Sequence, residues 1–218
     1  GKEGTVSSVY FPERDAVKLV STPTSDIFDT EINDPVKVSF YNGSKVIDAL
    51  SHFNGDVQGR IKYSEIDGEL MASDFTLANE DLQINLACAD PSLSFMEMSK
   101  EETDRAFGTE GSIFEFDLLT THVDKMKSLF NLEREEDTFT LAVNDKGVAV
   151  QGSSYDATLA HTYEGEGAEG QKVVIYKKYI NLLDKENYKV IVCSNKVVFR
   201  SLDTNTHLTV AVAITDED

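Results

Sequence analysis

Short runs that are apolar, or in which apolar and polar residues alternate, recur along most of the chain, as expected of β-strands. Turn-forming residues such as Gly, Asn and Asp separate these runs. The strands predicted in this way cover residues 5–11, 16–21, 36–40, 58–63, 69–73, 82–87, 138–143, 147–151, 172–175, 188–193, 197–201 and 208–214. The pattern therefore predicts a protein built mainly of strands.

Three segments carry a helical period instead. The first has Val46, Leu50 and Phe53 at spacings of four and three residues, and the third is short and covers residues 176–183. The second, at 117–130 with Asp117 as its expected N-cap, has an apolar stripe at spacings of four, three and four. Its members are Leu119, Val123, Met126 and Phe130. Because each segment has a single apolar stripe, each is expected to lie against a sheet.

The order of these elements repeats along the chain. The stretch VKVSFYNGSKVIDAL and the later stretch KVVIYKKYINLL are each followed by three strands, and an upstream hairpin aligns Val17 with Val148. A repeat of this size predicts two similar domains. We place an N-terminal domain at 1–92, an irregular charged connector at 93–110 and a C-terminal domain at 111–218. The same alignment puts the counterpart of helix 117–130 before Gly1, so the first domain is expected to lack its first helix.

The chain is strongly acidic, with 39 Asp and Glu against 20 Lys and Arg and a formal net charge of −19. Proteins that grip DNA over a large surface are basic, because Lys and Arg neutralise the phosphates. The composition therefore excludes a general DNA-binding surface. It does not exclude a local basic lining within an acidic body.

No arrangement of residues indicates catalysis or a metal site. His52, His122, His161 and His207 are scattered, and none has a second His or Cys at ligand spacing. Cys88 and Cys193 lie singly in apolar runs, which favours reduced buried thiols over a disulfide. We therefore expect no enzyme activity, no cofactor and no metal. The apolar runs are also shorter than the roughly 18 residues of a membrane span, so neither membrane insertion nor secretion is predicted.

From His122 to Asp218, the succession of a helix, a DKG hairpin, a second short helix and the closing run ENYKVIVCSNKVVFRSLDTNTHLTVAVAITDED resembles the T4-type bacteriophage DNA sliding clamps. The sequence ADPS at the start of the connector is similar too. The resemblance implies an α+β DNA-clamp fold, in which two similar domains of antiparallel sheet carry helices on one face. It further implies a homotrimeric ring around duplex DNA, acting as a processivity factor for the replicative DNA polymerase. A clamp loader would be a partner, and the cytoplasm of the infected bacterial host would be the location.

In such a ring the helices face the DNA, and the lysines on or beside the helical segments become candidates for the lining. These are Lys45, Lys125, Lys127, Lys177 and Lys178. At about 100° per residue, Lys125 and Lys127 fall on the two flanks of the apolar stripe of their helix. The centre of the exposed face carries Thr121, Asp124 and Ser128 instead. Ordinary solvated lysines remain an open alternative for each position.

Clamps of this family also bind short peptide tails of partner proteins in an apolar pocket near the connector and the last strand. Here the resemblance maps that pocket onto Leu93, Phe95, Met96, Met98, Val212 and Ile214. Methionine adapts to partners of varied shape, which suits such a site. The alternative is that these residues simply fasten the connector to the domains.

A second function class stays open beside the clamp. An acidic, two-domain, β-rich phage scaffold or host-interaction protein would show the same repeat without binding DNA. It would need neither helices on a common channel nor a basic lining.

Overall fold

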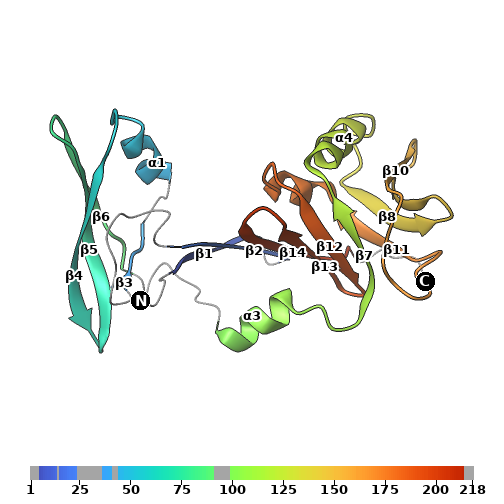
Figure 1. Cartoon of the computed structure of the whole chain (residues 1–218), viewed down its shortest axis with the longest axis horizontal. Helices are drawn as coiled ribbons and strands as arrows, with labels where there is room; N and C mark the ends of the chain where they lie inside the picture. Colours follow the sequence, from blue (N-terminus) through green and yellow to red (C-terminus); the bar gives the residue numbers. More distant parts are fainter. Residues whose placement is uncertain (1–4, 14, 24–35, 41–43, 91–98, 214–218) are drawn as a thin grey trace. The chain divides into compact units, whose positions relative to one another are not determined.

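The computed structural model describes residues 5–13, 15–23, 36–40, 44–90 and 99–213. The chain divides into two compact units, shown in Figure 1. Unit 1 consists of Gly1–Val6 and Pro23–Glu97, and unit 2 consists of Ser7–Thr22 and Met98–Asp218. Each unit is described by itself.

Unit 2 contains a six-stranded sheet whose strands come from both ends of the chain. Its order is β1 (Thr5–Glu13), β2 (Ala16–Pro23), β14 (Asn205–Ala211), β13 (Lys196–Ser201), β12 (Tyr188–Cys193) and β7 (Ser112–Leu118). From β2 to β7 the neighbouring strands pair antiparallel. The hairpin of β1 and β2 therefore belongs largely with the C-terminal half, whereas the repeat in the sequence predicted it in the first domain.

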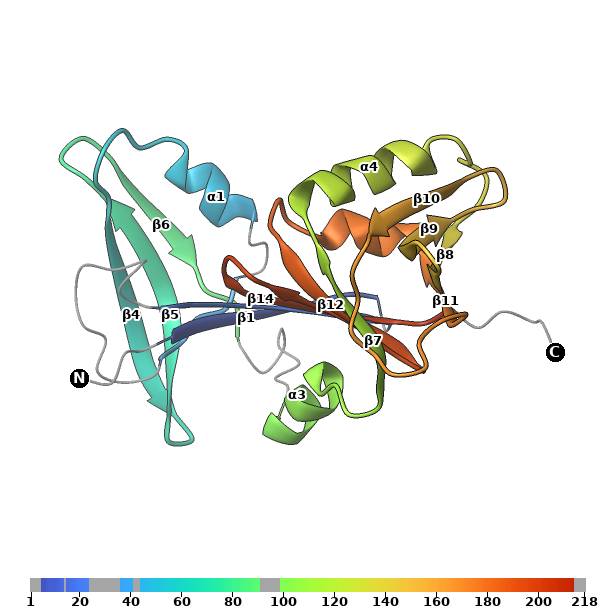
Figure 2. The ribbon, with the colours of Figure 1, turned by 45° about the vertical axis from the view of Figure 1, so that its right-hand side comes forward.

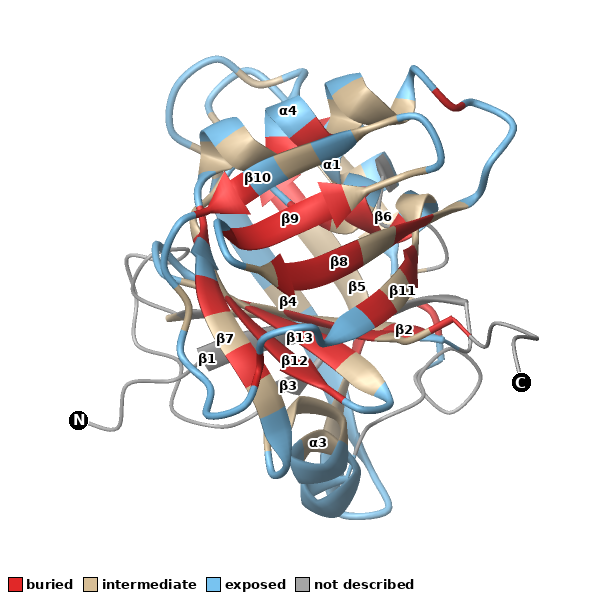
Figure 3. Ribbon diagram, turned by 90° about the vertical axis from the view of Figure 1, so that its right-hand side faces the viewer, coloured by how far each residue is buried: buried red, intermediate tan, exposed pale blue. Residues whose placement is uncertain are grey.

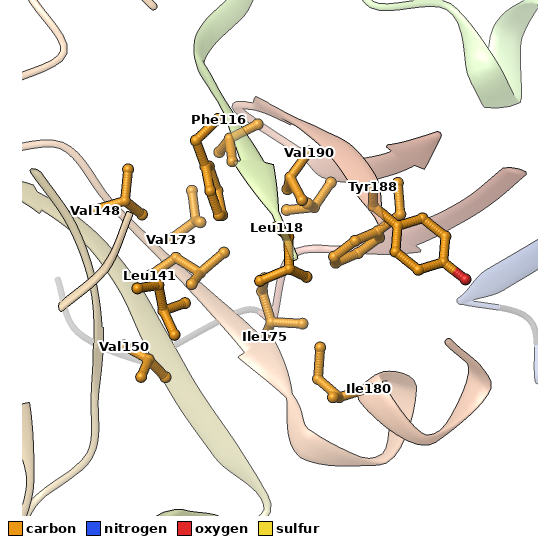
Figure 4. Packing of buried hydrophobic residues seen from close by; sticks show 14 of the residues in the cluster. Phe116, Leu118, Leu141, Val148, Val150, Val173, Ile175, Ile180, Tyr188 and Val190 are labelled. Carbon is orange, nitrogen blue, oxygen red and sulfur yellow. The ribbon is translucent and has the colours of Figure 1, made fainter. Parts of the chain in front are cut away.

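A second, four-stranded antiparallel sheet completes unit 2, in the order β10 (Asp156–Ala160), β9 (Gly147–Gln151), β8 (Thr138–Asn144) and β11 (Lys172–Tyr176). Buried side chains of both sheets belong to one hydrophobic core. Figure 3 shows the buried stretches of β8 and β9, and Figure 4 shows Phe116 and Leu118 of β7 near Leu141 of β8 and Val148 of β9. Unit 2 is thus a two-layer structure with an apolar interior.

Two helical segments of unit 2 add to this core. In α4 (Thr120–Phe130) Val123 and Met126 are buried, and in the 3₁₀ helix η2 (Lys177–Leu182) Tyr179 and Ile180 are buried. Of the stripe predicted for α4, Val123, Met126 and Phe130 therefore face the core, whereas Leu119 precedes the helix and is 45% exposed.

The N-cap predicted for α4 was wrong, because Asp117 lies within β7. The helix begins after Leu119, and the side-chain oxygen of Asn187 accepts the N–H of Thr120 at 3.1 Å. A residue distant in sequence therefore satisfies one of the free N–H groups of the first turn.

The predicted irregular connector contains a helix, α3 (Lys100–Phe107). Ser99 and Glu102 form a capping box, in which each side chain accepts the backbone N–H of the other at 3.1 and 2.8 Å. At the other end, Lys196 and Arg200 donate to backbone carbonyls of the last turn. Positive side chains at a helix C-terminus complement the helix dipole, and they hold α3 to strand β13.

Unit 1 repeats the last part of unit 2 in simpler form. A helix, α1 (Ser44–Leu50), precedes the antiparallel strands β4 (Gln58–Ile66), β5 (Glu69–Ala78) and β6 (Gln83–Ala87). In unit 2, η2 precedes β12, β13 and β14 in the same way. A short strand, β3 (Val36–Lys37), pairs parallel with β5.

The predicted fold class is confirmed: the fold is α+β, with antiparallel sheets and few helices in two similar units. Each predicted strand overlaps an observed one, and all three helical segments are present. Strands β7 and β10 and helix α3 were not predicted. None of the helices within the described ranges is long and apolar enough to cross a membrane.

Candidate nucleic-acid interface

Four of the five candidate lysines lie on two helical segments that contact each other. Lys125 and Lys127 are on α4, and Lys177 and Lys178 are on η2, drawn in orange beside α4 in Figure 2. Lys45 lies on α1 of unit 1, where it is exposed. The structure thus brings into contact two helical segments that are about 50 residues apart in sequence, as expected of helices that pack on one sheet surface.

The lysines of α4 flank the exposed face of the helix, as predicted. Lys125 is exposed and Lys127 is half-buried. Thr121 and Asp124, which lie between the two lysines around the helix axis, are exposed. Lys125 also borders a hollow of about 270 Å³ between α4 and β10. The other residues of this hollow are Ser128, Leu129, Ala157, Thr158 and Leu159.

Lys177 is engaged within the protein. Its side chain is only 11% exposed. Its ammonium donates to the backbone oxygen of Glu133 at 2.8 Å, lies 3.9 Å from the Glu133 carboxylate and sits 5.5 Å from the ring centre of Phe130. These contacts tie η2 to the segment that follows α4, so Lys177 holds the fold together at this point.

Glu133 is itself the centre of a buried polar cluster that the sequence did not reveal. Its carboxylate accepts the hydroxyls of Ser154 at 2.6 Å and Ser153 at 3.1 Å, as well as the N–H of Ser154. These hydrogen bonds hold the pKa of Glu133 below its usual range, and the bond from the Ser154 hydroxyl has the largest effect. At Gly152 a Cβ atom would collide with this carboxylate and with the ring of Tyr155, so a larger residue there would displace both side chains. The cluster fixes the turn before β10 against the end of α4.

Lys178 is exposed, in contrast to its neighbour. Its ammonium lies 5.1 Å from the ring centres of both Tyr176 and Tyr179. Such cation–π contacts restrict where the side chain points. Lys178 is therefore an oriented surface cation.

Two half-buried histidines of unit 2 are expected to make its stability sensitive to acid. Burial lowers the pKa of His122 in α4 and of His207 in β14, and Lys125 and Arg200 respectively lower it further. When the folded state lowers the pKa of a His, the unfolded state takes up its proton at a higher pH than the folded state does. The stability contribution of that His is therefore complete above the unfolded pKa of about 6.5. It is lost as the pH falls from there towards the folded pKa. We expect the denaturant midpoint of unit 2 to fall between pH 7.5 and 5.5, and to fall less in a His207→Leu variant. An equal slope in both proteins would contradict this assignment.

The predicted partner pocket falls largely outside the described residues, which include neither Leu93, Phe95, Met96 and Met98 nor Ile214. Val212 is described, and it is partly buried against the core of unit 2. Nor do the described residues contain a group of three His, Cys, Asp or Glu side chains that could hold a metal ion.

No protein-family profile matches this chain, and no curated protein matches it in sequence. Solved structures do match. The chain is similar to the β subunit of DNA polymerase from Streptococcus pyogenes, with 12% identity and a TM-score of 0.67 over 99% of this chain and 56% of that one. It is similar to the PCNA of A. fulgidus bound to the C-terminal region of FEN-1, with 12% identity and a TM-score of 0.59 over 94% of this chain and 84% of that one. A PCNA2–PCNA3 complex from Sulfolobus tokodaii matches at 11% identity and a TM-score of 0.62 over 97% and 87%.

Each of these structures matches the fold of this chain although only 11% or 12% of the aligned residues are identical. The chain spans little more than half of the bacterial subunit and most of the archaeal PCNA. The fold defined by the two units is therefore that of DNA polymerase sliding clamps.

Proposed function

We propose that this protein is a sliding clamp, a processivity factor that encircles duplex DNA and tethers the replicative DNA polymerase and other replication proteins. The observation that carries the proposal is the similarity of the whole chain, both units included, to bacterial and archaeal clamps. The finer proposal is a T4-type homotrimer that is opened by a clamp loader in the cytoplasm of an infected bacterial host. The protein itself would have no catalytic activity.

The charge distribution supports a ring better than a gripping surface. A chain with a net charge of −19 repels DNA in general, yet α4 and η2 carry exposed Lys125 and Lys178. A closed ring needs no tight phosphate contacts, because topology prevents dissociation. A few cations at the channel suffice to offset repulsion at physiological salt.

Open sheet edges support a head-to-tail assembly. Within the described strands, β10 pairs only with β9, and β6 pairs only with β5. Unpaired edges of this kind are templates for strand addition from another copy. Inside unit 2, β2 already joins β14 antiparallel, and β14 is the counterpart of β6 in the repeat. We propose that β10 of one copy pairs with β6 of the next.

Assembly is expected to depend on concentration and to stop at the trimer. Light scattering across a concentration series should show the mass rising from the 24.2 kDa protomer to about three times that value. In a Cys88→Ser background, cysteines placed at the exposed positions Thr158 of β10 and Asn85 of β6 should cross-link separate copies on mild oxidation. A single-site variant of either kind should stay uncross-linked. A strictly monomeric protein at all concentrations would contradict the ring.

We also propose that the connector and the C-terminal strand form the pocket for partner peptides, with Leu93, Phe95, Met96, Met98, Val212 and Ile214 as its lining. Large flexible apolar side chains in a charged segment support this role. A Phe95→Ala, Met96→Ala double variant is expected to weaken binding of a polymerase tail peptide about tenfold, measured by fluorescence anisotropy. Unchanged affinity together with an unchanged unfolding midpoint would contradict it.

A further inference from the structure

Strand β10 is held only weakly by packing, although it is the edge strand at which copies are proposed to join. Of its five residues only Leu159 and Ala160 are buried, and its register with β9 shifts between Thr158 and Ala160. Among the described strands it pairs with β9 alone. A strand with so few buried contacts opens easily unless other interactions fix it.

The turn that leads into β10 is tied to a single carboxylate. Glu133 belongs to the segment after α4, and its side chain is only 5% exposed. It accepts the hydroxyls of Ser153 and Ser154 and the N–H of Ser154. Burial first, and then the charges of Glu133 and Glu136, raise the pKa of Tyr155 to about 12. The charge of Glu133 therefore acts on the residues directly before β10.

The same carboxylate depends on a cation of η2. Its Oε1 atom accepts the hydrogen bonds from the serines, whereas Oε2 is buried and has no hydrogen-bond partner among the described residues. Oε2 lies 3.9 Å from the ammonium of Lys177, whose side chain is 11% exposed. Removing one partner of a buried ion pair leaves the other charge uncompensated, which favours its movement towards water. Without Lys177, Glu133 would give up its contacts with the serines.

We infer that Glu133 is a positioning residue for the joint between copies, where β10 of one copy is proposed to pair with β6 of the next, and that Lys177 holds Glu133 in place. With the ion pair intact, the carboxylate fixes the turn at 152–155 and keeps β10 paired with β9. The part of this inference that concerns assembly rests on the proposed function. It links η2, an element proposed to face the DNA, to the strand at which the next copy joins.

The first test measures amide hydrogen exchange of β10 at a concentration where light scattering gives the protomer mass, with β12 as the internal reference. Lys177→Met removes the charge but keeps much of the side-chain length. It is expected to accelerate β10 exchange about tenfold or more and to leave β12 unchanged, because the local opening free energy falls. Lys172→Met is the matched control, since it removes an exposed lysine from β11 of the same sheet. It should leave β10 exchange unchanged.

Two further variants test whether the effect passes through the carboxylate. Adding Glu133→Gln to Lys177→Met removes the uncompensated charge and keeps an oxygen for the serines, so most of the β10 protection should return. Ser154→Ala alone should accelerate β10 exchange, which keeps the test valid if Lys177→Met fails to fold. Combined with Lys177→Met, it should have less than the product of the two single effects. Unchanged β10 exchange in Lys177→Met, equal acceleration in β12, no rescue by Glu133→Gln or fully multiplicative effects would each overturn the inference.

The second test measures assembly by light scattering across a concentration series. The protomer–trimer midpoint of Lys177→Met is expected to rise about tenfold or more, because opening of β10 competes with pairing between copies. The rescued double variant and Lys172→Met should assemble like the unmodified protein. If β10 opens in Lys177→Met while assembly is unchanged, the link to the joint is wrong. If the unmodified protein never assembles, the proposed ring fails, and the exchange result still decides whether Glu133 positions β10.

Discussion

Replacing Lys125, Lys127 and Lys178 together by Glu is expected to lower clamp-dependent processive DNA synthesis about tenfold or more. Each reversal changes the charge by two, so three reversals take the protomer from −19 to −25, and a trimer carries every change three times. The added charges would lie on α4 and η2, the elements proposed to face the DNA. The repulsion between the introduced carboxylates and the DNA phosphates is strong at short range, so both loading onto DNA and sliding along it should be impaired. The measurement is product length on primed DNA with polymerase and loader present.

The matched control reverses Lys62, Lys146 and Lys172, which are exposed and lie on neither α4 nor η2. This variant has the same net charge of −25, obtained by the same three reversals from −19. It should keep most of the processivity, since charges farther than a Debye length of about 8 Å act weakly at physiological salt. Equal losses in both triple variants would show that only net charge matters. The proposal that these lysines line the DNA channel would then be wrong. If the protein is instead a scaffold that does not bind DNA, neither triple variant should lose processivity.

Lys177 is left out of the triple variant because of what the structure shows around it. The sequence placed Lys177 and Lys178 side by side on a short helix and gave no reason to treat them differently. Their different environments come from Glu133, whose carbonyl and carboxylate approach Lys177 from a loop 44 residues away. Local periodicity indicates which face a residue occupies. It carries no information about a polar partner contributed by another element.

Continuous apolar runs predicted strands such as β9 and β12, which are buried along most of their length, and alternation predicted strands such as β6 and β11, in which more and less exposed residues alternate. The missed strand β7 has the same alternation, with Phe114, Phe116 and Leu118 buried and charged residues between them. It went unrecognised because it follows a charged, Gly-containing stretch that was interpreted as linker. Helix α3 was missed for the same reason, although Ser99 and Glu102 already spell a capping box in the sequence. Strand β10 is short and has only Leu159 and Ala160 buried, so its pattern is weak.

The duplication was the strongest sequence signal, yet it misplaced the hairpin of β1 and β2. Sequence order favours grouping residues 7–22 with the first domain. Antiparallel pairing of β2 with β14 puts them in unit 2 instead, with Val17 opposite Thr209 and Leu19 opposite His207. Such long-range strand pairing depends on contacts across nearly the full chain. A repeat in sequence therefore establishes that two similar units exist, whereas tertiary pairing decides which strands each unit contains.

Truncation of Phe116 to Ala is expected to destabilise unit 2 by about 4 kcal/mol, because it removes a buried aromatic side chain and leaves a cavity. Phe116 is 2% exposed, pairs across the sheet with Val190 and has its ring 6.3 Å from that of Phe114. The corresponding fall in the melting temperature of unit 2 is about 10 °C. Differential scanning calorimetry and circular dichroism would record it.

Leu132→Ala provides the matched control, since Leu132 is a large hydrophobic residue that is 66% exposed just beyond α4. It should change the stability by no more than about 0.5 kcal/mol. If both variants lost the same stability, the core between the two sheets would not be the main source of the stability of unit 2. Amide exchange at β5 should respond to neither variant, because unit 1 shares no core cluster with unit 2 among the described residues. A simultaneous loss of protection in β5 and β12 on Phe116→Ala would instead mean that the units unfold together.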